Sequence, residues 1–288
     1  MAEVRGPEAP PVVPDQPVAV YRLRPARVDE PRLRALARQF ALDGTDKQGA
    51  IRRDARGLSY EQGQQVVYLH TASGGARYYD RQRWQVDDGE ANLDYSDRQA
   101  INVAQKYLQS RKLTPAGEQR VLRVSRLNVA AASLEQETVE PRVIDAGVAF
   151  QQVVDGIPVD GPGGKAIVYL DQGRQVTGVE RLWRDLGAAA KRVEVRRPEE
   201  VLAQLERRWA RAAEGVVTVT EFRFGYFELD WDSPQELLQP AYVALLTVVS
   251  PDEQVRINKV EVIPGSPQAT AGLVPPKKRP PPVPPRSE

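Results

Sequence analysis

The stretch "GVAFQQVVDGIPVDGPGGKAIVYLDQGRQVTGVERLW" spans residues 147–183, and Gly161-Pro162-Gly163-Gly164-Lys165 lies at its centre. A glycine-rich turn that ends in lysine suggests a phosphate-binding loop. Such a loop needs Gly, four residues, Gly, Lys and then Ser or Thr, at the start of a helix. Here Val159 stands at the first glycine position, Ala166 follows the lysine, and AIVYLD is strand-like. We therefore reject a nucleotide site and predict a hairpin turn between two strands.

The segments around this turn predict a helix followed by strands. Ser96 and Gln99 form a capping-box pattern at the start of a helix. Strands are predicted over 120–130, over 147–159, over 165–183 with a bend at Asp171-Gln172-Gly173, and more weakly over 141–144. Residues 131–140 fit a helix and a strand equally well.

The same order occurs before and after this segment. A helix with Asp29 as its N-cap precedes a predicted hairpin over 65–72 and 76–86, and a helix after Pro198 precedes strands over 216–230, 240–250 and 255–263. Short strands joined by turns favour antiparallel pairing. We therefore expect an α+β fold of tandem modules, each an amphipathic helix packed on an antiparallel β-sheet. The expected boundaries are a Pro-rich disordered linker (1–19), an N-terminal module (20–95), a central module (96–190), a C-terminal module (191–265) and a Pro-rich tail (266–288).

Composition excludes several classes of function. Hydrophobic residues make up 41% of the 288 residues and charged residues 27%, which is typical of globular proteins. A net charge of +1 gives no field that would attract nucleic acid. No apolar run is long enough for a transmembrane segment, and the absence of cysteine excludes disulfides and thiolate chemistry. Residues 1–19 lack the pattern of a secretory signal. The protein is then either cytoplasmic, or an exported protein whose signal or anchor lies upstream of Met1.

The central segment resembles the PepSY and fungalysin/thermolysin-propeptide modules of secreted bacterial proteins. The residues that carry the resemblance are Phe150, Gly156-Ile157-Pro158-Val159, and Val168 to Asp171 with Gly173, Val176 and Gly178. The chain plan is also similar to the extracytoplasmic accessory proteins YycH and YycI. The resemblance covers residues 96–186 and implies a non-catalytic protein located outside the cytoplasm.

No catalytic or metal site is predicted from the remaining polar residues. The single histidine, His70, lies in a predicted strand without an evident partner. The carboxylates of Asp43 and Asp46, of Asp87-Asp88-Gly89-Glu90 and of Asp230-Trp231-Asp232 do not follow a calcium-loop spacing, so we interpret them as solvated turn charge. We expect no cofactor. An enzyme of unrecognised type stays an alternative, with Asp155, Asp160 or Asp171 beside the glycine-rich turn as its carboxylates.

Two segments are candidates for contact with a partner. Phe222, Phe224 and Tyr226 alternate on one face of a predicted strand, Phe227 lies on the other face, and Trp231 follows. This cluster is either a sheet core or a partner surface. In the tail, Arg279, Pro282 and Pro285 match a polyproline recognition pattern, although we favour a spacer.

We therefore expect a non-catalytic, extracytoplasmic binding or regulatory protein. Its partner would be an envelope protein, a membrane sensor or a protease, and we expect no nucleic-acid partner. The alternative is a structural component of a larger envelope or filament-like assembly, in which case the protein associates with itself.

Overall fold

The computed structural model describes residues 2–42, 49–83, 93–114, 117–129, 142–212 and 214–269, together with Leu273. Within them the chain forms the helices α1 (Glu30–Gln39), α2 (Asp97–Ser110) and α3 (Pro198–Ala212). The strands there are β1 (Glu3–Arg5), β2 (Val18–Leu23), β3 (Ala50–Arg53), β4 (Gly57–Gln62), β5 (Gln65–His70), β6 (Ala76–Asp80), β7 (Glu118–Val129), β8 (Arg142–Val154), β9 (Ile157–Asp160), β10 (Lys165–Leu170), β11 (Val176–Leu182), β12 (Leu186–Val193), β13 (Val216–Phe227), β14 (Leu237–Val249) and β15 (Arg256–Pro264).

These strands hydrogen-bond into one large mixed sheet. Its order is β12-β2-β14-β13-β9-β8-β10-β11-β6-β5-β4-β3, with β1 on β13, β15 on β14 and β7 on β8. The pairs β1–β13 and β9–β13 are parallel, whereas the other pairs are antiparallel. The sheet therefore departs from the purely antiparallel pairing that short connections predict.

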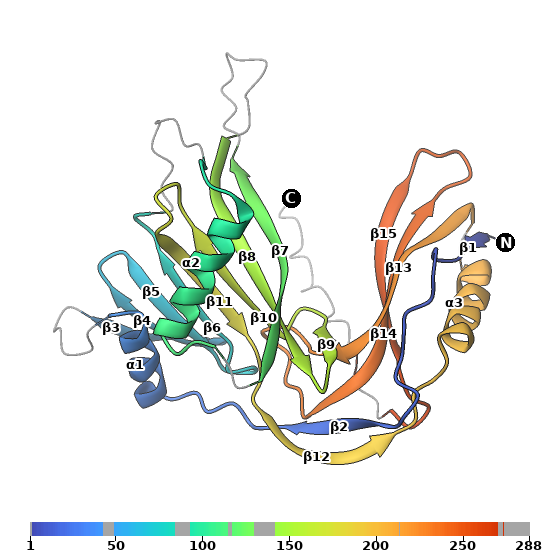
Figure 1. Ribbon diagram of the computed structural model, residues 1–288, viewed down its shortest axis with the longest axis horizontal. Coiled ribbons are helices and arrows are strands. Elements are labelled where there is room, and N and C mark those ends of the chain that lie inside the picture. Colours follow the sequence, from blue (N-terminus) through green and yellow to red (C-terminus); the bar gives the residue numbers. More distant parts are fainter. Residues whose placement is uncertain are drawn as a thin grey trace, which may run out of the picture.

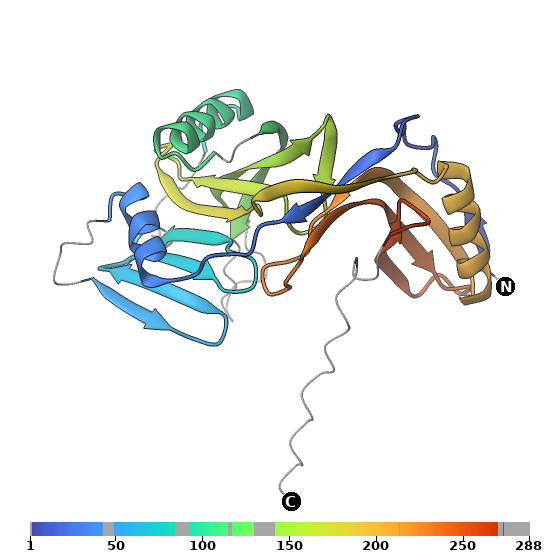
Figure 2. The same ribbon diagram turned by 90° about the horizontal axis from the view of Figure 1, so that it is seen from below.

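The sheet is shared between two lobes that stand side by side (Figures 1 and 2). The first lobe holds α1 and α2 with β3–β8, β10 and β11, and the second holds α3 with β1 and β13–β15. Strands β2 and β12 pair with each other and run between the lobes at the lower edge of Figure 1. Strand β9 lies between the two lobes, where it pairs with β8 of the first lobe and with β13 of the second.

Each lobe has a hydrophobic core of its own. In the first lobe, Leu33 of α1 and Leu108 of α2 are fully buried in the same cluster as Phe150 of β8. In the second lobe, Trp209 of α3 packs in a cluster with Tyr242 of β14. In each lobe the apolar stripe of the helix is buried against the sheet, and this burial forms the core.

The local signals for helices and for the first hairpin are confirmed. The Asp29 side chain accepts a hydrogen bond from the Arg32 N–H (2.9 Å) at the start of α1. Ser96 and Gln99 form a capping box at the start of α2. Strands β5 and β6 pair as an antiparallel hairpin. Caps and tight turns depend on neighbours in sequence, which is why the sequence predicts them well.

The expected fold class of tandem PepSY-like α+β modules is wrong. Strand β6 from the expected N-terminal module pairs with β11 from the expected central module, through Tyr79 opposite Gly178. Helices α1 and α2 share one core, so the first two expected modules form one lobe. Apolar periodicity predicts single elements, but it does not determine which distant strands pair, and here distant pairings join the whole sheet.

The predicted hairpin at Gly161–Lys165 is also wrong. Strands β9 and β10, both fully described, pair with β8 and not with each other. The hairpin instead forms at Asp155-Gly156, which both have positive φ (51° and 75°), as a two-residue type I′ turn requires. An Asp-Gly pair is a strong hairpin signal, and it divides the expected strand 147–159 into β8 and β9.

Several strands lie where none was expected. Strand β1 lies within residues 1–19 and pairs with β13, and β2 and β12 form the connection between the lobes. None of the three helices among the described residues has the length and apolar character needed to cross a membrane.

Candidate binding cleft

A cleft of about 680 Å³ lies between the two lobes. The first lobe contributes β7, the end of β8 and Lys165, and the second lobe contributes one face of β13–β15. Pro158 and Asp160 of β9 and the Gly161-Pro162 turn line the space between them. The volume falls in the range of ligand sites, so the cleft is the candidate functional site.

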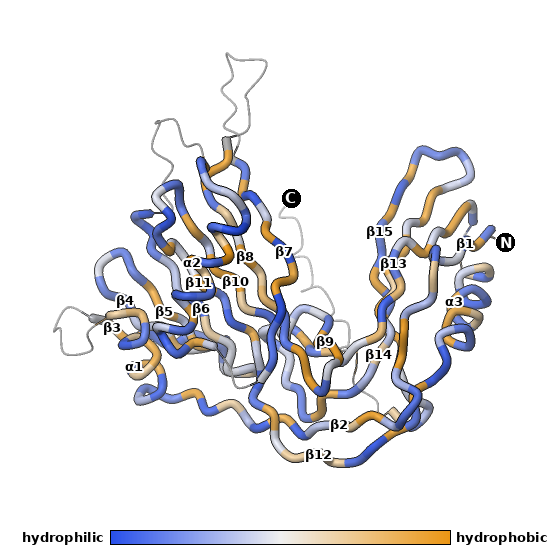
Figure 3. Tube along the Cα trace, in the orientation of Figure 1, coloured by the Kyte–Doolittle hydropathy of each residue, from blue (hydrophilic) through white to orange (hydrophobic). Residues whose placement is uncertain are grey.

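One wall of the cleft is apolar. Val243 and Leu245 of β14 pair with Val262 and Val260 of β15, and cross-strand partners lie on the same face of a sheet. We call this the inner face of the β13–β15 sheet. Val260 is 64% exposed although it is a large hydrophobic residue. The orange stretches along β13–β15 in Figure 3 lie across from β7.

A second hollow extends the apolar wall along the sheet. It has a volume of about 240 Å³ and is lined by Thr220, Asn258 and other residues of β13–β15. Leu245 and Val260 line both hollows, so the two adjoin along β14 and β15. Together they extend along the inner face of the sheet.

The opposite wall carries arginines. Arg120, Leu122 and Arg123 of β7 line the cleft, and the side chains of all three are exposed. Arg120 Nε donates to Gln151 Oε1 (2.9 Å). No hydrogen bond or ion pair to another described residue is found for Arg123. The part of β7 nearest β9 is correspondingly coloured hydrophilic in Figure 3.

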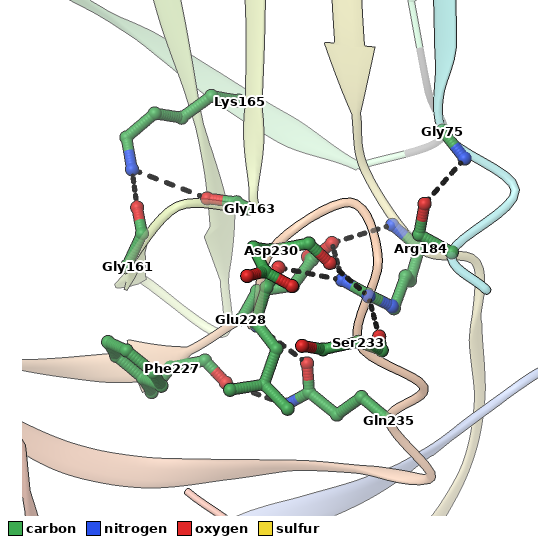
Figure 4. A network of polar contacts seen from close by, with 12 residues as sticks. Gly75, Gly161, Gly163, Lys165, Arg184, Phe227, Glu228, Asp230, Ser233 and Gln235 are labelled. Atoms are coloured by element: carbon green, nitrogen blue, oxygen red, sulfur yellow. Dashed lines mark hydrogen bonds and ion pairs between the residues drawn. The ribbon is translucent and has the colours of Figure 1, made fainter. Parts of the chain in front are cut away.

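The glycine-rich turn forms the base of the cleft and is held by its own lysine. Lys165 Nζ donates to the carbonyl oxygens of Gly161 and Gly163 (Figure 4). Burial lowers the pKa of Lys165, while Asp160 and Glu228 act in the opposite direction. A side chain at position 163 would not fit, because its Cβ would lie 2.5 Å from Glu228 Cγ. This lysine therefore closes the turn and does not present its charge to a phosphate.

A buried ion pair joins the two lobes beside this turn (Figure 4). Arg184 Nη1 donates to Glu228 Oε1 (3.0 Å) and to the carbonyl of Leu229 (3.0 Å). Its Nη2 donates to the carbonyls of Asp230 (2.9 Å) and Ser233 (2.6 Å). Arg184 follows β11 of the first lobe and Glu228 follows β13 of the second. The guanidinium therefore fixes the 228–233 segment to the first lobe and sets the position of the inner face.

Burial raises the pKa of Glu228 to about 7, and its contacts with Arg184 act against that rise. The Arg184 and Glu228 side chains are 4% and 1% exposed. Glu228 Oε2 has no hydrogen-bond partner among the described residues. An ion pair this deeply buried depends on both partners, since removal of one leaves an uncompensated buried group.

Trp231 makes a second contact between the lobes. The Arg77 guanidinium lies 4.3 Å from the centre of its ring, and the His70 ring lies 4.8 Å from it. His70 Nδ1 is 3.6 Å from Asp232 Oδ1, which is too long for a hydrogen bond. Burial, reinforced by Arg77, lowers the pKa of His70. Trp231 therefore contacts the first lobe of its own chain.

The other predicted partner-binding residues lie in different environments. Phe222, Phe224 and Tyr226 belong to the core beneath α3 and are at most 8% exposed. Phe227 lies on the inner face, where it is buried in a small cluster with Val243 and Leu273, and it lines the cleft, as does Phe224. Arg279, Pro282 and Pro285 lie outside the described residues.

The carboxylates considered for an enzyme do not form one cluster. Asp155 accepts a hydrogen bond from the Tyr21 hydroxyl, Asp160 pairs with Arg223 (2.8 Å) and Asp171 pairs with Arg83 (3.1 Å). The carboxylates of 43–46 and 87–90 lie outside the described residues. In the part of the chain that the structure describes, no group of three or more His, Asp or Glu side chains could hold a metal ion.

Sequence reasoning did not identify Arg123, Val260, Arg184 or Glu228. A signal was available for Val260: the strands over 240–250 and 255–263 are apolar on both faces, and one helix covers only one face of a sheet. No local signal exists for the ion pair, whose partners are 44 residues apart in the chain.

Neither a protein-family model nor a curated protein sequence matches this chain. The fold is similar to that of an uncharacterised protein from Eubacterium rectale ATCC 33656, solved by crystallography at 1.45 Å resolution. The two are 11% identical, with a TM-score of 0.57 over 92% of this chain and 88% of the other. At this identity the likeness shows the fold alone. It does not show a relation to PepSY modules or to YycH and YycI.

Proposed function

We propose that this is a non-catalytic binding protein whose cleft receives an extended segment of a partner protein. The observation that carries the proposal is the apolar inner face of the β13–β15 sheet, which is open to solvent at Val260 (64% exposed) and faces the arginines of β7 across the cleft. Exposed apolar surface of this kind is characteristic of binding surfaces. The extracytoplasmic location and the lack of enzymatic activity stay predictions from the sequence.

The elongated shape favours a chain segment over a compact small molecule. Two adjoining hollows lie along β14 and β15, and Leu245 and Val260 are common to both. An extended segment places side chains into successive hollows, whereas a small ligand needs only one enclosed pocket.

The test uses two residues of β15 that lie on opposite faces. Val260 lies on the inner face, and Ile257, which pairs with Val248 and is 45% exposed, lies on the face that carries α3. Twelve-residue peptides selected by display against the full chain are rebound to the variants Val260→Asp and Ile257→Asp. The proposal predicts that binding is lost with V260D and retained with I257D.

Thermal unfolding of both variants verifies that each one is folded. Peptides that bind both variants equally, or a selection that enriches no peptide, would contradict the proposal.

A further inference from the structure

Building on this proposed function, we infer that the partner segment is acidic. Its carboxylates would pair with Arg123 and Arg120 of β7, and its neighbouring apolar side chains would pack on Leu245 and Val260. The inference therefore assigns the chemical class of the partner, and Arg123 becomes the residue that determines specificity.

The acidic residues of the cleft are already neutralised. Asp160 and Glu221 line the cleft, and both accept from the guanidinium of Arg223. Arg223 Nε lies 2.8 Å from Asp160 Oδ2, so this arginine is held between two carboxylates of the same chain. A basic partner would have to compete with Arg223 for either carboxylate.

The basic residues are not neutralised to the same extent. Four basic residues line the cleft (Arg120, Arg123, Lys165 and Arg223) against two acidic ones, a difference of +2. Lys165 donates to a carbonyl oxygen of its own turn. Arg120 and Arg123 are therefore the basic residues with donors left for a partner.

Arg123 has the greatest capacity for a new carboxylate. It has no hydrogen-bond or ion-pair partner among the described residues, and Arg120 uses only its Nε, toward Gln151. A guanidinium binds a carboxylate through two parallel N–H donors, which makes Arg123 a specific site for an acidic side chain.

The apolar wall sets the second requirement. Val260 is 64% exposed, and Leu245 lies directly opposite it on β14. A segment that carried only acidic and polar residues would leave this wall in contact with water. The partner therefore needs apolar residues next to its acidic ones.

Leu273 packs on the inner face in the same cluster as Val243, so this chain already covers one part of that face. Charge argues against the segment that follows Leu273, and against a second copy, as occupants of the rest of the cleft. The C-terminal segment 274–288 contains Lys277, Lys278, Arg279 and Arg286 against Glu288, so it has the same sign as the β7 wall. Strand β7 of a second copy would bring the same arginines. Like charges at close approach disfavour both arrangements.

The experiment measures the fluorescence polarisation of three labelled peptides of equal length with the full chain. The first alternates glutamate and valine, the second lysine and valine, and the third glutamate and serine. We expect the glutamate–valine peptide to bind at least tenfold more tightly than the other two, with an affinity that falls as salt is added.

Protein variants then test whether Arg123 causes the preference for the glutamate–valine peptide. Arg123→Glu should weaken glutamate–valine binding about tenfold or more and should improve lysine–valine binding. The matched control is Arg207→Glu, which makes the same charge change on an exposed residue of α3 and should alter affinity less than twofold. The reversed preference of R123E cannot arise from misfolding, so the test stays decisive if the variant is less stable.

The outcomes separate this inference from the proposed function. If peptide binding depends on Val260 but not on charge, the binding role stands and the acidic partner is rejected. If binding depends on neither Val260 nor Arg123, both are rejected. Arg123-dependent binding to vesicles of phosphatidylglycerol, without binding of any peptide, would identify an anionic membrane surface and overturn the inference.

Discussion

The two faces of the β13–β15 sheet differ in what covers them. On the outer face, α3 buries Trp209 against a core that includes Phe224 and Tyr242. On the inner face, Leu245 and Val260 line an open cleft opposite β7. Both faces are apolar, yet only one has a helix on it among the described residues. The comparison shows how one sheet can stabilise a lobe with one face and offer the other for binding.

The largest expected difference between the two faces is in their contribution to stability. Trp209 is 6% exposed, and Trp209→Ala should lower the free energy of unfolding by about 3–5 kcal/mol through the cavity it leaves. Val260→Ala on the inner face should change it by no more than about 0.5 kcal/mol, because the side chain is already mostly in water. Urea unfolding measures both. Equal losses would mean that the inner face is part of the core.

The next effect concerns the ion pair that fixes the inner face opposite β7. Arg184→Met should lower the free energy of unfolding by about 3 kcal/mol, because Glu228 then stays buried without its partner. We expect the lower end of the range for such pairs, since the raised pKa of Glu228 lets its carboxyl become neutral.

Arg223→Met is the control for that variant. It removes the ion pairs of a 43% exposed arginine with Asp160 and Glu221, and it should lower the free energy of unfolding by at most about 1 kcal/mol. Similar losses for the two variants, again from urea unfolding, would contradict a special role for Arg184 at the junction of the lobes.

We expect a smaller change in stability when the pH is varied. Glu228 has a folded pKa of about 7 against an ordinary value of 4.5. Between these values the folded protein keeps a proton that the unfolded chain has released, so stability should fall as pH rises through this window. The slope for one group is at most about 1.4 kcal/mol per pH unit. Unfolding measured from pH 4.5 to 7.5 tests this.

Two variants test whether Glu228 causes this pH dependence of stability. Glu228→Gln should flatten it in the same pH range, whereas Glu236→Gln, at an exposed position in the adjacent loop, should leave it in place. A slope that survives E228Q would have to come from another group.

The sequence predicted the features that depend on near neighbours. Asp29 and Ser96 mark the starts of α1 and α2 because a cap acts within one turn of helix. The Asp155-Gly156 turn is equally local, and its Asp-Gly pair is a stronger hairpin signal than the glycines of Gly161–Lys165.

The pairing of strands and the cleft could not be predicted in the same way. Arg123 and Val260 are far apart in sequence, and they line one cleft only because β9 connects β8 to β13. Phe227 was predicted to lie on the face opposite Phe222 and Phe224, but the sequence did not indicate which of the two faces α3 would cover. That depends on where α3 packs, which is a property of the tertiary structure.

The central claim is that the inner face, and not the outer face, contacts the partner segment. The chain contains no cysteine, so one introduced thiol can carry a photoreactive benzophenone at a chosen position. Val260→Cys and Ile257→Cys place it on opposite faces of β15, and each labelled protein is irradiated with the glutamate–valine peptide. We predict a crosslinked peptide from the V260C protein, little from the I257C protein, and loss of the crosslink when Arg123→Glu is added. Equal crosslinking from both positions, or crosslinking from I257C alone, would contradict the account.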